Sequence, residues 1–351
     1  MTSRGAVIAA RLQEWGALDL PLERDVFGSA DPEQLAGSVD AWCRLHLGTP
    51  IERYEFFESS SGSVHGVVLQ DGRSVVVKGH RAAVTYDYLV ALRDVQAALA
   101  HSGYPAPAPL AGPVAEGSGH VTAEAMLDRS SCVDGHDPGV RAVIATGLAQ
   151  FVRLSRRHRE HLATVSHPLT IPDGSIYPTP HSTRFDFAST ASGAEWIDEL
   201  AVRAQSRLRT SPAVPIVVVH GDWRIENLCV RGSRLAGVYD WDSVHVAREV
   251  AAVASAATTF SVDWRQHGGV RFPRPDEIAA FVSDYEVARG DPFSKDESAV
   301  LAATIVASLA YGARCEHADT GEPPSGDDSQ RGLLATLGAA ILDGGLDAFS
   351  A

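Results

Sequence analysis

The sequence predicts an α+β protein with two lobes, a β-rich N-terminal lobe and a mostly helical C-terminal lobe, and three observations support this. Two Val-rich runs, 64–69 and 74–78, flank an Asp-Gly pair, which is a strong signal for an antiparallel hairpin. Beyond residue 137, most segments carry apolar residues at helical spacing. A strand-like run at 216–227, IVVVHGDWRIEN, is embedded in this helical part. We therefore divide the chain into a helical extension (1–50), a β-rich lobe (51–130) and a helical lobe (131–351).

The composition is that of a soluble globular protein in a reducing compartment. Of 351 residues, 45% are hydrophobic and 21% are charged. The four cysteines are far apart and form no CxxC pair, which argues against a zinc site or a disulfide framework and for the cytoplasm. We expect no membrane partner, because the richest apolar stretch, 297–317, is interrupted by small and polar residues and suits a buried helix better.

The net charge narrows the range of partners. At −14 it argues against nucleic acid. An acidic surface helps to attract a cationic small molecule, but it equally keeps a protein soluble, and both explanations stay open.

The first 130 residues contain the elements expected of the extension and the β-rich lobe. Residues 1–50 have the apolar spacing of amphipathic helices, which either pack on the β-rich lobe or form an interface. A Ser/Gly loop at 59–63 should precede the hairpin. A helix over 85–101 should end before the Pro-rich stretch that follows it. A further strand is expected within 119–128.

Lysine usage singles out one residue of this lobe. Of 30 basic residues only two are lysines, Lys78 and Lys295. Lys78 ends the Val-rich strand SVVVK, and arginine and lysine differ in shape and donor geometry. A lysine kept here indicates a specific role, with chance as the alternative.

The helical lobe is expected to contain six helices and one acid-bearing hairpin. The helices are expected at 138–161, 193–208, 246–259, 276–289, 296–318 and 330–341. The Pro-rich segment 166–192 is either a substrate-side loop or a surface crossing. Asp222 and Asp240 come at the ends of short strands, and Asn227 begins the hairpin strand NLCV, with RGSR as the turn between NLCV and LAGVYD. Oxygen ligands of this kind suit Mg²⁺, and phosphoryl transfer needs mainly positioning and charge neutralisation.

Three motifs resemble a known family over about residues 50–320. HGDWRIEN at 220–227, YDWDS at 239–243 and VVVK at 75–78 are similar to the motifs of aminoglycoside phosphotransferases and choline kinases. These enzymes have a protein-kinase-like bilobal fold, which the resemblance implies here. It also implies ATP or GTP as phosphate donor, together with Mg²⁺.

The resemblance assigns catalytic and metal-binding roles to residues of the helical lobe. Asp222 would accept or orient the proton of the substrate hydroxyl, and Asn227 and Asp240 would bind the metal. Arg224 would either stabilise the transferred phosphoryl group or form a salt bridge to Glu226, and we weigh the two equally. By analogy, the histidine at 220 would brace the loop rather than act as a base.

The resemblance also assigns a nucleotide site. Lys78 would hold the α- and β-phosphates, paired with an acid on the following helix, where Asp87 is preferred to Asp94. Glu124 and Met126 would lie at the hinge that meets adenine. The phosphates would be covered by the loop residues Ser60, Ser61, Gly62 and Ser63.

The chain departs from the family pattern after Asp242. The usual Gly-Asp-Pro and the Asp downstream of it are missing, since this chain has DSVHVAREVAAV. Neither a DFG nor an APE stretch is present, which argues against a protein substrate.

The predicted function is therefore that of a kinase acting on a hydroxyl of a small molecule. The substrate could be an aminoglycoside, an amino sugar, a choline-like alcohol or a related metabolite. The acids Asp284, Glu286 and Glu316 either meet a cationic substrate or are ordinary surface residues. The alternative is a catalytically inactive nucleotide-binding regulatory protein of the same fold. The sequence leaves the oligomeric state open.

Overall fold

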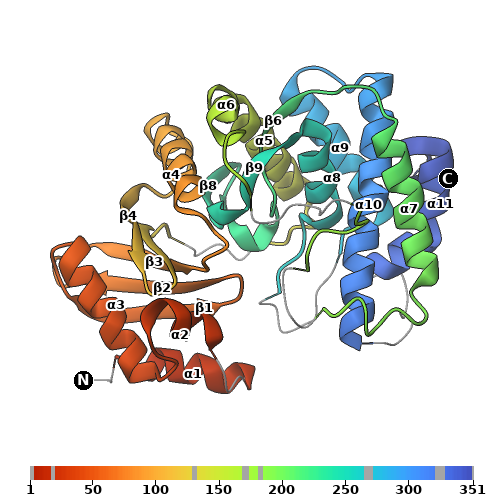
Figure 1. The fold of residues 1–351 in the computed structure, drawn as a ribbon. Helices are drawn as coiled ribbons and strands as arrows, with labels where there is room; N and C mark the ends of the chain where they lie inside the picture. Colours follow the sequence, from red (N-terminus) through yellow and green to blue (C-terminus); the bar gives the residue numbers. More distant parts are fainter. Residues whose placement is uncertain are drawn as a thin grey trace. The chain divides into compact units, whose positions relative to one another are not determined.

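The chain divides into two compact units, each described here by itself. The computed structural model describes residues 4–16, 20–128, 133–167, 174–180, 185–264, 272–320 and 329–349. The first unit comprises Met1–Asp128 and Thr164–Pro168, and the second comprises Arg129–Ala163 and Leu169–Ala351 (Figure 1). Cys132 and parts of the Pro-rich segment 166–192 lie outside the described residues.

The first unit is built on a five-stranded antiparallel sheet in the order β1-β2-β3-β5-β4. The expected hairpin is confirmed, because β2 and β3 pair from Gly62 with His80 to Val68 with Ser74. Gly72 in its turn has φ 87°, a backbone conformation that glycine adopts without strain. The strands are β1 (Ile51–Ser59), β2 (Gly62–Leu69), β3 (Ser74–His80), β4 (Pro109–Glu116) and β5 (Gly119–Ala125).

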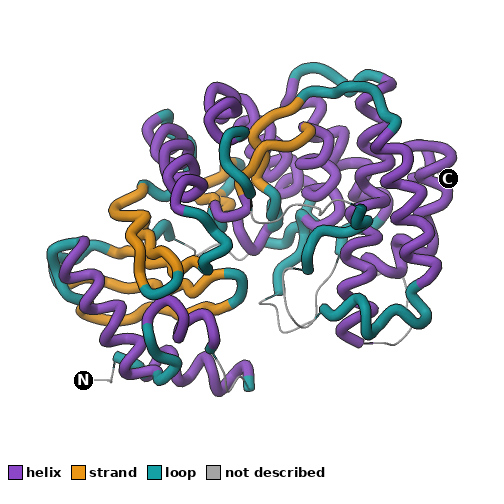
Figure 2. Tube along the Cα trace, in the orientation of Figure 1, coloured by secondary structure: helices purple, strands orange, loops and turns teal. Residues whose placement is uncertain are grey.

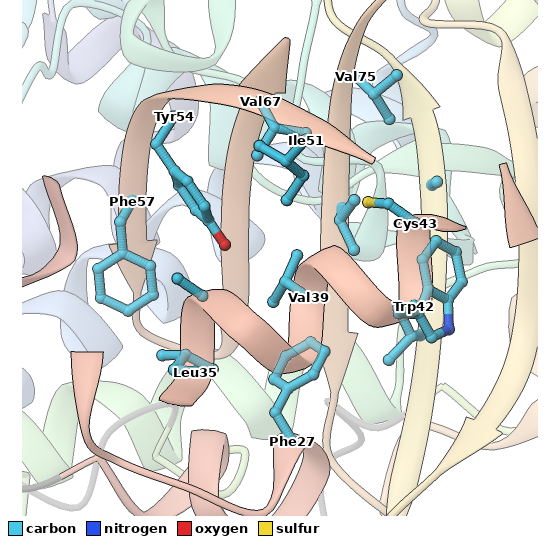
Figure 3. Packing of buried hydrophobic residues seen from close by; sticks show 14 of the residues in the cluster. Phe27, Leu35, Val39, Trp42, Cys43, Ile51, Tyr54, Phe57, Val67 and Val75 are labelled. Carbon is cyan, nitrogen blue, oxygen red and sulfur yellow. The ribbon is translucent and has the colours of Figure 1, made fainter. Parts of the chain in front are cut away.

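Residues 6–46 form three helices that share one hydrophobic core with the sheet. They are α1 (Ala6–Trp15), α2 (Pro21–Phe27) and α3 (Pro32–His46). Figure 3 shows Leu35, Val39 and Trp42 of α3 beside the sheet residues Ile51 and Val67, all of them in a single buried cluster. Of the two alternatives for this segment, packing on the β-rich lobe is therefore the one seen.

Helix α4 (Tyr86–His101) follows β3 and lies close to the expected 85–101 range. Thr85 caps its N-terminus by accepting a hydrogen bond from the backbone N–H of Tyr88 at 3.3 Å. Tyr88, Leu89 and Val95 are buried, which satisfies the apolar spacing of the sequence.

The second unit is mostly helical, with two short antiparallel strand pairs among the helices (Figure 2). Helix α10 packs against α7, α8 and α11, and α5 packs against α9 and β6. The helices are α5 (Pro138–Ser155), α6 (Arg159–Leu162), α7 (Glu195–Arg209), α8 (Glu249–Thr259), α9 (Pro275–Arg289), α10 (Lys295–Thr320) and α11 (Gln330–Gly344). The strand pairs are β6 (Ile216–His220) with β9 (Val244–Arg248), and β7 (Leu228–Arg231) with β8 (Arg234–Val238).

Two expected helix boundaries were wrong. The helix expected over 246–259 begins at Glu249, because residues 244–248 form β9 and take up the free edge of β6. The helix expected over 138–161 ends at Ser155 and continues as a 3₁₀ turn and the short α6.

Helices α10 and α11 are long and apolar enough to span a membrane by length and composition alone. The core helix of a globular protein passes the same test. Of the apolar window in α10, 61% is buried within the structure, and of that in α11, 33%. Near the end of α10, the buried Arg314 contacts Asp198 at 3.4 Å and Thr190 at 3.2 Å. These contacts place α10 in the core of the second unit.

Candidate active site

The residues His220–Asn227, here called the HGD loop, connect β6 to β7. Strand β6 ends at His220, and a 3₁₀ turn over Ile225–Asn227 leads into β7. The backbone N–H of Ile225 donates to the carbonyl of Phe260 at 2.8 Å. The loop is therefore supported from the end of helix α8.

His220 ties the HGD loop to the residues after β8. It is fully buried, and its Nε2 lies 2.8 Å from the carbonyl oxygen of Tyr239, so Nε2 carries the proton and donates. Nδ1 then accepts the backbone N–H of Asp222 at 3.4 Å. Gly221 donates its N–H to the carbonyl of Ser243 at 3.1 Å. These contacts give His220 the bracing role expected from the sequence.

Asp222 lies at the centre of a group of polar side chains. Its Oδ2 accepts a hydrogen bond from Asn227 Nδ2 at 2.8 Å and pairs with Arg224 at 3.1 Å. Burial and a hydrogen bond to the neighbouring carboxyl of Asp240 raise the pKa of Asp222 to about 7, although Arg224 opposes the shift. A carboxyl with a pKa near neutrality can exchange a proton at physiological pH.

Asp240 has an unusual backbone. At φ 56° and ψ 52° it is the one non-glycine residue with positive φ among the described ranges. This left-handed conformation costs about 1 kcal/mol or more for an L-residue. The hydroxyl of Ser243 donates to the carbonyl of Asp240 at 3.0 Å, and Tyr239 N–H donates to the carbonyl of Asn227 at 2.8 Å. The backbone is thereby held so that the carboxyl of Asp240 meets that of Asp222.

The donor set fits a hard divalent cation. Asn227 uses its amide nitrogen on Asp222, so its side-chain oxygen remains as a donor beside the carboxylates of Asp222 and Asp240. Within the described ranges no group of three or more His, Cys, Asp or Glu side chains is suited to hold a metal. A site here would rely on an amide and one or two carboxylates completed by phosphate and water, which is the way Mg²⁺ is commonly bound.

Arg224 lies between two acids. One of its terminal nitrogens pairs with Asp222, and its Nε is 3.2 Å from Glu226. The salt bridge to Glu226, one of the two alternatives for Arg224, is therefore present. The role in phosphoryl transfer stays a prediction.

Lys78 of the first unit has a different partner from the one expected. Its Nζ pairs with Glu124 Oε1 at 3.2 Å, and Glu124 Oε2 accepts a hydrogen bond from Gln96 Nε2 at 2.7 Å. Asp87 is exposed in the first turn of α4, so its assignment as the partner was wrong. Glu124, expected at adenine, takes that place because β3 and β5 are neighbouring strands. Cross-strand pairing of this kind is invisible until the strand order is known.

One other expected nucleotide contact, the hydroxyl of Ser63, needs correction, and those of Ser60, Ser61, Gly62 and Met126 stay predictions. Ser63 is fully buried, and its hydroxyl is hydrogen-bonded to His65 at 2.9 Å on the helix-covered side of the sheet. Side chains alternate along a strand, so the Ser63 hydroxyl does not lie on the face of Lys78. Ser60 and Ser61 are exposed at the β1–β2 turn. The backbone N–H of Met126 donates to the carbonyl of Ser74 at 3.0 Å, which leaves only its carbonyl for adenine.

The three acids considered for a cationic substrate all have structural partners. Asp284 pairs with Arg141 at 2.8 Å, and Glu286 accepts the backbone N–H of Phe293 at 2.7 Å. Glu316 accepts the N–H groups at the start of α11. None of the three is thereby singled out as a substrate contact.

Sequence reasoning missed three side chains that support these sites. Gln96 contacts Glu124, Ser243 contacts His220 and Asp240, and Ser255 donates to the carbonyl of Gly221 at 3.3 Å. Ser243 ends the motif YDWDS, which is the signal that could have drawn attention to it.

Comparison with solved structures shows a common fold. The amicoumacin kinase hAmiN, solved with AMP-PNP, Ca²⁺ and Ami, is 10% identical, with a TM-score of 0.56 over 84% of this chain and 90% of that one. A protein described as a fructosamine-3-kinase from Thermobifida fusca YX-ER1 is 16% identical, with a TM-score of 0.53 over 87% and 99%. An ethanolamine kinase from Plasmodium vivax is 12% identical, with a TM-score of 0.50 over 92% and 91%.

The sequence itself also matches a family model. No curated protein matches the chain. The model of the phosphotransferase enzyme family matches residues 65–290, which include both the Lys78 strand and the HGD loop. The chain therefore belongs to the phosphotransferase enzyme family and has the protein-kinase-like fold that its motifs predicted.

Proposed function

We propose that this protein is a phosphotransferase that uses ATP or GTP and Mg²⁺ to phosphorylate a hydroxyl of a small molecule. The observation that carries the proposal is the contact of Asp222 with Asn227 and Asp240 at the ends of short strands. Family membership supports the same chemistry.

In this proposal, Asp240 and the residues of the HGD loop have separate roles in phosphoryl transfer. Asp222 orients the acceptor hydroxyl and takes its proton, and 27% of its side chain remains exposed for that contact. Mg²⁺ bound at Asn227 and Asp240 would neutralise charge on the phosphate oxygens. Arg224 lies next to Asp222 and supplies a second positive charge for the transferred group.

The acceptor is proposed from the compounds that the sequence suggested. The solved neighbours are named for amicoumacin, fructosamine and ethanolamine. We propose an aminoglycoside, another amino sugar, a choline-like alcohol or a related metabolite as acceptor, and the cytoplasm as location.

The test is a screen for nucleotide consumption with Mg²⁺ against a panel of these compounds. Turnover with one class should fall by about 10²–10⁴-fold in Asp222→Asn, the range expected when a general base is lost. Asp296→Asn, which removes an exposed carboxylate in the first turn of α10, is the matched control and should keep full activity.

The second candidate function is an inactive nucleotide-binding regulator, since Lys78 and its partners are intact in the first unit. Tight nucleotide binding without turnover on any acceptor would favour it. An active wild type whose turnover is unchanged in Asp222→Asn would refute the proposed role of the HGD loop.

A further inference from the structure

We propose that Glu124 and Gln96 are positioning residues for Lys78. The nucleotide-binding lysine of this chain is held by an acid on strand β5, and helix α4 orients that acid through a neutral amide. The inference rests on the proposed function, because it concerns the lysine assigned to the nucleotide phosphates.

The strand register places the lysine and the acid on one face of the sheet. Lys78 pairs in register with Thr122, and Val76 pairs with Glu124. Residues two apart on a strand share a face, so Lys78 and Glu124 are diagonal neighbours across β3 and β5. Val75 and Val77 belong to the core with α1–α3, so Lys78 projects from the opposite face.

Both oxygens of the Glu124 carboxylate are used. Oε1 pairs with Lys78 at 3.2 Å and Oε2 accepts from Gln96 at 2.7 Å. Rotation of the carboxylate would lose one contact or the other. Gln96 therefore determines how Glu124 is presented to the lysine.

Because the three side chains are buried, the loss of any one contact among them should be costly. Lys78, Glu124 and Gln96 are only 6%, 9% and 5% exposed. Removing one partner of a buried ion pair leaves a charge that the surroundings do not compensate. Gln96 holds the second oxygen of the Glu124 carboxylate without placing another negative charge beside it.

The acids of α4 itself are not needed in this scheme. Asp94 is exposed and pairs with its neighbour Arg93 at 3.0 Å. The helix contributes through Gln96, which lies about two and a half turns beyond Asp87, the first-turn acid that the family resemblance suggested.

The experiment measures the affinity of the intact protein for a fluorescent ADP analogue with Mg²⁺, together with the melting temperature with and without ADP. Glu124→Gln should weaken binding by about tenfold or more, since it removes the counter-charge of a buried lysine. Gln96→Met keeps the charge and loses only the orienting hydrogen bond, so binding should weaken by about three- to tenfold. Glu124→Asp keeps the charge and should lie between wild type and Glu124→Gln. Asp94→Asn removes an exposed carboxylate of the same helix and should bind as wild type.

A purely structural role would lower the melting temperature of the free protein and leave the affinity for ADP unchanged. The proposal requires that the affinity falls, also in those variants whose free protein melts as wild type does. Binding within about twofold of wild type in both Glu124→Gln and Gln96→Met would overturn it. A wild type that binds no nucleotide would instead refute the proposed function, and the inference with it.

Discussion

The charged clusters of the two units are balanced in opposite ways. In the first unit, one ammonium faces one carboxylate, and a neutral amide uses the remaining oxygen. In the second unit, Arg224 pairs with the carboxylates of Asp222 and Glu226, and the carboxyl of Asp240 contacts that of Asp222. The first group thus contains one acid and one lysine, whereas the second contains three acids and one arginine. This difference in composition agrees with the proposal that a cation binds beside the HGD loop.

The largest effect is expected when the group around Asp222, Asp240 and Arg224 loses a carboxylate. Asp240→Asn should lower kcat by about 10³-fold, because the variant loses a carboxylate that we propose as a metal ligand. Mn²⁺ used as a probe should bind with at least tenfold lower affinity when measured by paramagnetic resonance. Affinity for nucleotide without metal should stay as in wild type. Equal Mn²⁺ affinity in the variant and the wild type would contradict the proposal that the cation binds at Asp240.

A second test examines how far helix α3 stabilises the sheet that carries Lys78 and Glu124. Trp42 of α3 is 3% exposed in the core beneath the sheet. Trp42→Ala should reduce the free energy of unfolding by about 3–5 kcal/mol, the usual cost of an aromatic cavity. Urea denaturation followed by circular dichroism measures it, with Trp15→Ala, a partly exposed tryptophan of α1, as a milder comparison. A loss below about 1 kcal/mol would show that residues 1–50 do not stabilise the sheet.

A third test concerns His65, a buried histidine of the first unit that stays neutral in the folded protein. Burial lowers the pKa of His65 to about 3, from an ordinary value of 6.5. Between these pH values the unfolded chain takes up a proton that the folded chain does not. Stability is therefore complete above pH 6.5 and falls on acidification by up to about 1.4 kcal/mol per pH unit, levelling off near pH 3.

The variant His65→Gln should remove this part of the pH dependence while keeping a partner for Ser63. Urea denaturation at pH 7.0 and 5.5 gives the loss of stability on acidification, which should be about 1–2 kcal/mol smaller in the variant. The same loss in both proteins would mean that this site in the first unit admits a proton.

The smallest effect is expected at the serines that support the HGD loop. Ser243→Ala removes the hydrogen bond to the carbonyl of Asp240 and the 3.2 Å contact with Nδ1 of His220, and it should lower kcat about fivefold, in line with roughly 1 kcal/mol per hydrogen bond. Ser255→Ala loses a longer contact at 3.3 Å and should have a smaller effect. Steady-state kinetics should show the change in kcat rather than in KM for nucleotide. A change confined to KM would count against a positioning role in the second unit.

Features encoded by local patterns could be predicted from the sequence. The hairpin at 64–78 follows from its Asp-Gly turn, and the HGD and YDW motifs placed Asp222, Asn227 and Asp240 at strand ends, where the structure brings them together. In each case a few consecutive residues carry the information.

Features that depend on strand order or on a face of the sheet could not be predicted in the same way. The Lys78–Glu124 pair joins strands about 45 residues apart, and its register is set by pairing of β3 with β5. Ser63 was misassigned although alternation with His65 already placed both on one side of the strand. The start of α8 moved because β6 needed a partner strand, which is a tertiary requirement.

At Asp240, the left-handed backbone lowers the stability of the fold, whereas the carboxylate is the group that we propose to serve activity. Glycine adopts this conformation without strain, so Asp240→Gly would relieve the backbone and remove the carboxylate in one step. A lineage released from selection for phosphotransfer would have a ready route to a more stable, inactive protein through this one codon. Whether aspartate or glycine occupies the position in related chains should therefore distinguish working enzymes from those that retain only the fold.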